Sequence, residues 1–366
     1  MGGIVFGAVT PHPPLLVPQI GRGQEAKVKA TSDAMATLAK ELQTANPDTV
    51  LLISPHGRFH HDAMGVFSGR ACHGDFLLWG VPGLDLDFHN DSDLAAAIKE
   101  EARALDVPVR ELGGDEYALD EDQGSLVPMF FLKPALPHVS LVPLTFTWLP
   151  LETHLRFGQT LRRAAERSGR RVAVIASGDL SHRLIPGAPA GYTPQGEVFD
   201  RQVVEAVRTL DRDAILNLDP TLIEQAGECG LRSIAILMGA MEGLTARPRV
   251  LSYEGPFGVG YLVASIPVEQ QSDSPVQQAG QTHLIVQLAR DAVEKCVLGG
   301  GAVTPTVLIE EMRQRAGVFV CLKVNGALRG CIGTFEPSRA NVAEEIVANS
   351  LCSALQDPRF LPVTPE

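Results

Sequence analysis

The sequence predicts an α/β fold, a mixed or mostly parallel sheet with helices on both faces, followed by a partial α+β domain. Short apolar runs alternate with helical patterns up to about residue 267, as in sheets covered by helices. Two of these runs, TVLLISP and RVAVIASG, are apolar almost throughout, which is typical of central strands buried on both faces. Residues 268–282 are polar, rich in glutamine and without periodicity, and they predict a linker.

The elements of the larger domain, residues 1–267, follow from the spacing of apolar residues. We expect five strands, at GIVFGAV, TVLLISP, VSLVPLTF, RVAVIASG and GVGYLVASI. We expect five helices, at 23–45, 91–105, 152–169, 197–209 and 230–242. The chain has 366 residues, of which 45% are hydrophobic, and this is enough apolar material for two domains.

The smaller domain, residues 283–366, begins with an amphipathic helix that ends at two consecutive glycines. The segment GVFVCLKVNGALRGCIGT then predicts a β-hairpin that turns at Asn325 and Gly326. Residues 339–356 are again helical in pattern. The glycines around Arg329 and Cys331 suit backbone turns, and we prefer this interpretation to a reactive cysteine.

Composition excludes several classes of function. The net charge of −12 and the absence of basic runs argue against a nucleic-acid partner. No apolar run reaches the roughly 18–20 residues that a membrane span needs, and no signal peptide is evident, so we expect a cytoplasmic protein. The six cysteines form no CxxC pair, and we expect them to be reduced thiols.

Histidines follow two of the predicted strands at the point where each strand ends. His12 lies between prolines after GIVFGAV, and His56 follows TVLLISP, with His60 and His61 close behind in the loop. Ligands of open α/β sheets bind at the carboxyl ends of strands, so such side chains converge there. We expect His60 and His61 to be exposed or to support the site indirectly.

Two further segments carry chemically capable residues. Asp179 and His182 follow the strand RVAVIASG, and Asp179 is placed to orient or charge-stabilise His182. Glu228 and Cys229 lie between two glycines directly before a predicted helix. Two imidazoles and one carboxylate form the set that suits Fe(II) and leaves positions open for substrate and dioxygen.

Each of these residues also has a purely structural interpretation. His12 suits a turn, Asp179 suits a helix N-cap, and Glu228 is favourable as an anion near a helix N-terminus. Cys229 suits a small buried apolar position. Because the four segments occur in one α/β domain, we favour a metal site over four unrelated structural roles.

The motifs TPHPP, SPHGRF, SGDLSHR and AGECGLRSI, in this order, resemble those of the class III extradiol (LigB-like) ring-cleavage dioxygenases and the related Memo proteins. This resemblance covers about residues 3–267. NGALRGCIGT is similar to the hallmark of the AMMECR-type domain, of which the chain contains roughly the first half. The pairing of domains resembles the AmmeMemoRadiSam system proteins, which implies a radical SAM partner protein.

The dioxygenase resemblance implies that His12 and His56 bind a metal, with Fe(II) as the first choice and zinc and copper as alternatives. The third ligand is implied to be Glu228, as in ring-cleaving members, or Cys229, as in Memo-like members. His182 then corresponds to the acid/base histidine, and Asp179 to its partner. The implied reactants are a catechol-type aromatic and O2.

One departure keeps a second function open. Many ring-cleaving relatives have a histidine where this chain has Gln123, and an amide cannot shuttle a proton near neutrality. The alternative to an extradiol dioxygenase is therefore a metal-binding, Memo-like accessory protein without ring-cleaving turnover. A zinc hydrolase using Asp179 and His182 is a weaker third hypothesis.

Overall fold

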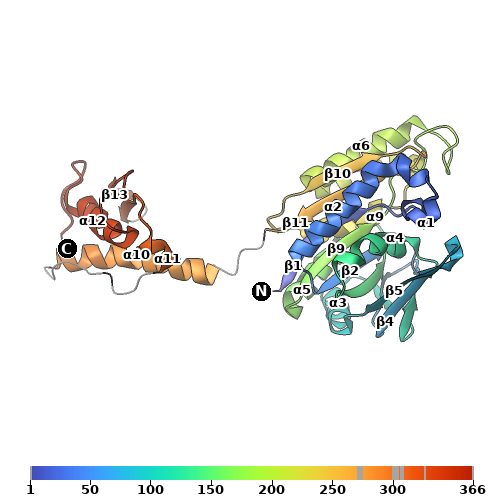
Figure 1. The fold of residues 1–366 in the computed structure, drawn as a ribbon, viewed down its shortest axis with the longest axis horizontal. Coiled ribbons are helices and arrows are strands. Elements are labelled where there is room, and N and C mark those ends of the chain that lie inside the picture. Colours follow the sequence, from blue (N-terminus) through green and yellow to red (C-terminus); the bar gives the residue numbers. More distant parts are fainter. Residues whose placement is uncertain (1, 270–274, 299–304, 306–308, 325–326, 365–366) are drawn as a thin grey trace. The chain divides into compact units, whose positions relative to one another are not determined.

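A computed structural model describes residues 2–269, 275–298, 305, 309–324 and 327–364. The chain divides into two compact units, Met1–Gln270 and Gln271–Glu366 (Figure 1). Among the described residues, no helix is both long enough and apolar enough to span a membrane.

The larger unit is built on an eight-stranded sheet in the order β10-β11-β1-β9-β2-β8-β3-β6. The central strands β1, β9, β2 and β8 are parallel neighbours, whereas β11 is antiparallel to β1 and β3 to β8. The sheet is therefore mixed, as predicted. The five predicted strands are all present, as β1 (Gly3–Thr10), β2 (Thr49–Ser54), β8 (Ser140–Thr145), β9 (Arg171–Ser177) and β11 (Tyr261–Pro267).

Six strands in this unit were not predicted. Three of them extend the large sheet: β3 (Met64–Val66), β6 (Val109–Glu111) and β10 (Arg249–Glu254). The others form a separate sheet in the order β5-β4-β7: β4 (Ala71–Phe76), β5 (Val81–His89) and β7 (Glu116–Ala118). Most of these strands are only three residues long or are largely exposed and polar, so hydrophobic periodicity does not reveal them.

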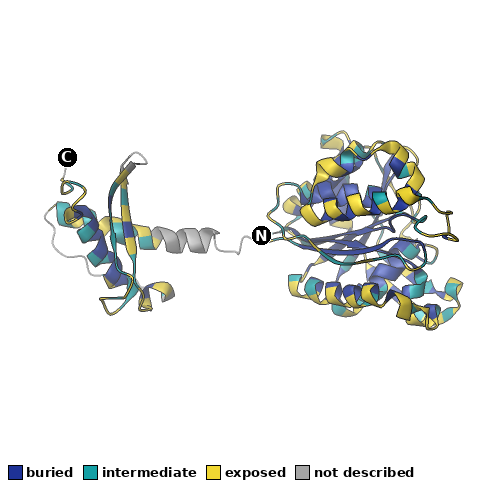
Figure 2. Cartoon of the chain, turned by 90° about the horizontal axis from the view of Figure 1, so that it is seen from above, coloured by how far each residue is buried: buried dark blue, intermediate teal, exposed yellow. Residues whose placement is uncertain are grey.

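Helices cover both faces of the large sheet, as predicted, and leave the strands buried between them (Figure 2). Helices α2 and α4 pack on one face, and α3, α5, α6 and α9 on the other. The helices are α1 (Pro18–Gly21), α2 (Lys29–Ala45), α3 (Ser92–Ala104), α4 (Gln123–Leu132), α5 (Leu151–Ser168), α6 (Pro194–Thr209), α7 (Arg212–Leu216), α8 (Pro220–Ala226) and α9 (Leu231–Met241).

Short 3-10 turns join several of these elements: η1 (Pro14–Leu16), η2 (Gln24–Val28), η3 (Leu77–Trp79) and η4 (Lys133–Ala135). The predicted helix 23–45 is therefore a 3-10 turn followed by α2. Side-chain caps mark the starts of α3, α4 and α6, where Asp91, Asp122 and Thr193 each accept a hydrogen bond from a backbone N–H of the first turn.

The smaller unit contains α10 (Pro275–Val297), α11 (Glu310–Arg313), β12 (Phe319–Val324), β13 (Ala327–Gly333) and α12 (Val342–Leu355). Strands β12 and β13 form the predicted hairpin, while its turn at Asn325 and Gly326 lies outside the described residues, as do Gly299 and Gly300. Residues 275–282, which we expected to belong to the linker, are part of α10.

One expectation about the cysteines is wrong. Cys321 and Cys331 are directly opposite each other on β12 and β13, with Cα atoms 4.2 Å apart, and a disulfide joins them. The other four cysteines are free, as expected: Cys72, Cys229, Cys296 and Cys352.

Candidate metal centre

Three neighbouring strands bring the predicted site residues to one edge of the sheet. In the order β1-β9-β2, each strand is parallel to the next, so their carboxyl ends meet. His12 follows β1, Asp179 follows β9 and His56 follows β2, each by two residues. Residues more than 160 positions apart in the sequence, such as His12 and Asp179, are therefore in hydrogen-bonding contact.

Cys229 reaches this edge because two glycine backbones touch. A Cβ atom on Gly178 would lie 2.1 Å from the Cα atom of Gly230, so neither loop leaves room for a side chain at that contact. The backbone N–H of Cys229 donates to the carbonyl of Asp179 at 3.2 Å, and the N–H of Asp179 donates to the Cys229 sulfur at 3.3 Å. The thiol is therefore fixed beside the end of β9.

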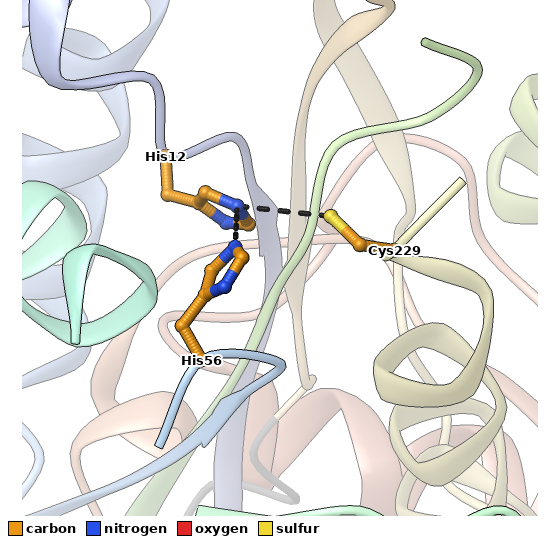
Figure 3. Close-up of side chains that lie close together, drawn as sticks. All are labelled: His12, His56 and Cys229. Carbon is orange, nitrogen blue, oxygen red and sulfur yellow. Dashed lines mark hydrogen bonds between the residues drawn. The ribbon is translucent and has the colours of Figure 1, made fainter. Parts of the chain in front are cut away.

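The two histidines and the cysteine form a compact group of potential ligands (Figure 3). The Nε2 atom of His12 lies 3.0 Å from Nε2 of His56 and 3.7 Å from Sγ of Cys229. One ligand atom from each of the three residues lies within 4.8 Å of the other two. The two imidazole rings are edge-to-face, with an interplanar angle of 89°.

His12 is held in place from several sides. It is almost fully buried, and its Nδ1 atom shares a hydrogen bond of 3.0 Å with the hydroxyl of Ser177. Its backbone N–H donates to Oδ1 of Asp179 at 3.0 Å. The flanking prolines restrict the backbone further. The ring therefore presents Nε2 to His56 and Cys229.

His56 is fixed by a network that also contains the start of α4. The Ser54 hydroxyl accepts a hydrogen bond from the backbone N–H of His56 at 3.1 Å and donates one to the buried carboxylate of Asp122. Asp122 also accepts from the backbone N–H and the hydroxyl of Ser125. The Nε2 atom of Gln123 lies 3.4 Å from Nε2 of His56. Sequence reasoning identified Gln123 but missed the Ser54–Asp122 link.

Among the described residues, Cys229 rather than Glu228 lies in the group of potential ligands with the two histidines, whereas we expected Glu228 as the third ligand. Its carboxylate accepts a hydrogen bond from the backbone N–H of Leu231 at 2.6 Å, and its other oxygen lies 3.8 Å from the Arg232 guanidinium. Glu228 therefore serves the first turn of α9, the structural role that was the alternative at this position.

Asp179 and His182 lie together beside the centre. The buried Asp179 carboxylate is 3.9 Å from Nε2 of His12 and 4.0 Å from Nε2 of His182. The Nδ1 atom of His182 shares a hydrogen bond of 2.5 Å with the carbonyl of Gly227. His60 and His61 are not part of this group of ligands, since the structure places them on the loop after His56.

Burial controls the protonation of the potential ligands. It lowers the pKa of His12 to about 3, helped by repulsion from His182, and that of His56 to about 4. Burial raises the pKa of Asp179, against the stabilising N–H of His12, and raises the pKa of Cys229 well above its usual value. At neutral pH both imidazoles are therefore uncharged and have lone pairs to offer, whereas the thiol keeps its proton in the absence of a cation.

This set of side chains fits a metal ion chemically. Neutral imidazole nitrogen and thiolate sulfur are ligands for zinc and copper, and a bound cation deprotonates a coordinating thiol outright. The ring nitrogen of His12 that faces away from the group is already engaged, as is common for metal-binding histidines. Without a metal ion, two imidazole nitrogens 3.0 Å apart repel each other unless one of them carries a proton and donates a hydrogen bond to the other.

A cavity of about 480 Å³ adjoins the centre at His56. Its wall contains the apolar side chains Leu77 and Leu78, the Tyr117 ring and the Arg58 side chain, whose guanidinium stacks over that ring. The remaining charged residues of the wall are acidic: Asp75, Asp120, Glu121 and Asp122. The volume is within the range of small-molecule sites.

Residues 7–264 match the family described as the catalytic LigB subunit of aromatic ring-opening dioxygenase. The chain belongs to this LigB family. Residues 286–366 match the AMMECR1 family, so the chain combines a LigB region with an AMMECR1 region, as the motifs predicted.

The relatives of this LigB chain are of more than one kind. A protein of Clostridium acetobutylicum is 33% identical over 373 residues, covering 96% of this chain and 80% of that protein. The beta subunit of 2-aminophenol 1,6-dioxygenase from a Pseudomonas species is 27% identical over 254 residues, covering 62% of this chain and 81% of the subunit. A MEMO1 family protein of Methanothermobacter thermautotrophicus is 27% identical over 191 residues, covering 52% of this chain and 59% of that protein.

Proposed function

We propose that the LigB domain holds one non-haem metal ion at His12, His56 and Cys229 and functions as a Memo-like metalloprotein. The observation that carries this proposal is the position of Cys229, whose sulfur lies 3.7 Å from Nε2 of His12 while the Glu228 carboxylate is engaged at the start of α9. Thiolate with two imidazoles favours copper or zinc, whereas two imidazoles with a carboxylate favour Fe(II).

Asp179 and His182 supply proton-transfer capacity beside this ion. Asp179 lies between His12 and His182, at 3.9 and 4.0 Å from their Nε2 atoms. A buried carboxylate with a raised pKa in contact with an imidazole is suited to hold or pass a proton near neutral pH. When bound, the metal supplies Lewis acidity or electron transfer, and these two residues manage the proton.

Metal analysis of three forms of the full chain tests the ligand set. We expect the wild type and Glu228→Gln to retain about one equivalent of metal after dialysis, and Cys229→Ser to lose most of it. Glu228→Gln is the matched control, because it changes the neighbouring residue and keeps a side chain able to accept the Leu231 N–H. Loss of metal in Glu228→Gln with retention in Cys229→Ser would refute the proposal.

Extradiol ring cleavage is the second candidate. It is favoured by the cavity beside His56, by the Asp179–His182 pair and by the similarity to the 2-aminophenol 1,6-dioxygenase subunit. Its reactants would be O2 and a small catechol or aminophenol. Oxygen uptake by iron-loaded protein with these aromatics separates the candidates: a Memo-like protein gives no stimulated uptake, and uptake that is abolished in His182→Ala supports ring cleavage.

The AMMECR1 region gives the proposal a wider context. A LigB region and an AMMECR1 region in one chain support a role in a modification system with a radical SAM partner. We propose residues 1–267 and 283–366 as the two domains that act in it. Copurification with a radical SAM protein encoded in the same genome tests the partner, and its absence under anaerobic conditions counts against it.

A further inference from the structure

Gln123 is the first residue of α4, and its side chain lies at the candidate metal centre without being one of the three ligands. Its amide nitrogen is 3.4 Å from Nε2 of His56, and the same nitrogen of His56 lies 3.0 Å from Nε2 of His12. The amide nitrogen therefore contacts the ring nitrogen that His56 would give to the metal.

The position of Gln123 relative to His56 is fixed by the backbone. Asp122 caps α4 and is bound to the Ser54 hydroxyl, which in turn accepts the His56 N–H. Packing reinforces this link, because a Cβ atom on Gly124 would lie 2.2 Å from the Ser54 oxygen. The turn before α4 and the turn after β2 therefore behave as one unit.

Metal binding would deprive the Gln123 amide of its partner. An ion on Nε2 of His56 occupies the ring nitrogen that now contacts the amide, so the N–H needs another acceptor. A bound ion lies about 2 Å from an imidazole nitrogen, which places the Gln123 nitrogen within about 5.5 Å of it. An atom attached to the ion on this side is then within reach of a hydrogen bond from the amide.

We propose that Gln123 is a positioning residue that donates a hydrogen bond to an anionic ligand atom on the metal ion. The inference rests on the proposed metal site. The acidic side chains of the adjoining cavity cannot supply this donor while they are ionised. The Arg58 guanidinium is engaged elsewhere, since it donates to the Gly113 carbonyl at 2.8 Å and stacks over Tyr117. An amide also stays a donor at every pH, unlike an imidazole.

Azide binding to the cobalt-loaded full chain tests the proposal, with the visible absorption bands of Co(II) as the signal. Gln123→Leu keeps the size of the side chain and removes the donor, and Gln123→Glu replaces the amide with an anion. Since one hydrogen bond to a charged group contributes about 1.5–3 kcal/mol, we expect azide to bind Gln123→Leu about tenfold more weakly or worse. Gln123→Glu should lose at least as much, because its carboxylate repels the anion.

Two controls separate the possible failures. Gln43→Leu removes an exposed amide on α2, far from the centre in sequence and fold, and should leave azide affinity unchanged. The affinity for Co(II) should stay within about threefold of wild type in the Gln123 variants, and Gln123→Asn provides a milder variant if Gln123→Leu does not fold. Unchanged azide affinity, or a fall in Co(II) affinity alone, would show that Gln123 only orients His56. Failure of the wild type to bind Co(II) would overturn the metal site itself.

Discussion

Gly178→Ala is the sharpest test of how the fold builds the centre. The added Cβ would lie 2.1 Å from the Cα atom and 3.0 Å from the nitrogen of Gly230, and both are backbone atoms that cannot rotate away. Since ordinary contacts begin at 3.4 Å, the loops after β9 and before α9 would have to separate by more than about 1 Å. Cys229 is attached to the loop that must move.

The loss of stability can be estimated from the contacts between these two loops. Overpacking of this kind costs about 1–3 kcal/mol. The two hydrogen bonds between Asp179 and Cys229, at 3.2 and 3.3 Å, would be stretched beyond useful length and cost about 0.5–1.5 kcal/mol each. We therefore expect the free energy of unfolding to fall by roughly 2–6 kcal/mol. Metal affinity should fall roughly 10- to 100-fold because the thiol is displaced.

Calorimetry and metal titration of the full chain measure both effects. A unit of this size should lose roughly 4–11 °C in transition temperature. Gly113→Ala is the matched control, because a Cβ there meets nothing within 4 Å and its φ is not positive. If Gly178→Ala matches Gly113→Ala in both transition temperature and metal affinity, the contact of Gly178 with Gly230 does not position Cys229. Our account of the site is then refuted.

Three further predictions concern the surroundings of the centre. Ser54→Ala removes one hydrogen-bond donor from the buried Asp122 carboxylate. It should lower the free energy of unfolding, measured in urea, by about 1–3 kcal/mol. The control Ser338→Ala, in the smaller unit, should leave the unfolding transition of the larger unit unchanged. Glu228→Ala removes the acceptor of the Leu231 N–H and should cost about 1 kcal/mol of stability with metal affinity nearly unchanged; a cost near zero would argue against the capping role. For metal-free protein, the pKa of His12 is about 3 in the folded chain, against an ordinary value of 6.5 for the unfolded chain. Between these values the unfolded chain binds a proton that the folded chain does not, so stability should fall as pH decreases from 6.5. Burial of His56, whose pKa falls to about 4, adds to this trend, and the raised pKa of Asp179 opposes it. We expect a net loss of about 2 kcal/mol between pH 7 and pH 5, smaller in His12→Gln; a flat profile in the wild type would contradict the burial argument.

Hydrophobic patterns were sufficient for the central part of the fold. The strands that precede His12, His56 and Asp179 are apolar almost throughout because helices cover both of their faces, and such runs are conspicuous in a sequence. The strands between residues 64 and 118 are short or largely exposed. The pairings of β3 with β6 and of β4 with β7 join residues distant in sequence, which no local pattern encodes.

The sequence could not decide which residue joins His12 and His56 in the group of potential ligands, because the answer depends on a shift of one residue along the chain. Glu228 and Cys229 are adjacent and both are chemically capable ligands. The choice between them is made by the contact of Gly178 with Gly230 and by the first free N–H groups of α9, which attract the Glu228 carboxylate. Neither contact is visible before the strand and the helix are placed in space.

The positions of Glu228 and Gln123 have related physical causes, and both underlie our proposal of a Memo-like metalloprotein. A helix N-terminus lies at each: the Glu228 carboxylate accepts a backbone N–H at the start of α9, and the first residue of α4 presents its amide, which does not titrate near neutral pH, to His56. Asp179 and His182 are then the residues beside the centre that are suited to proton transfer. A protein with this arrangement can bind and orient a ligand on a metal ion while having fewer groups to carry protons through a ring-opening cycle.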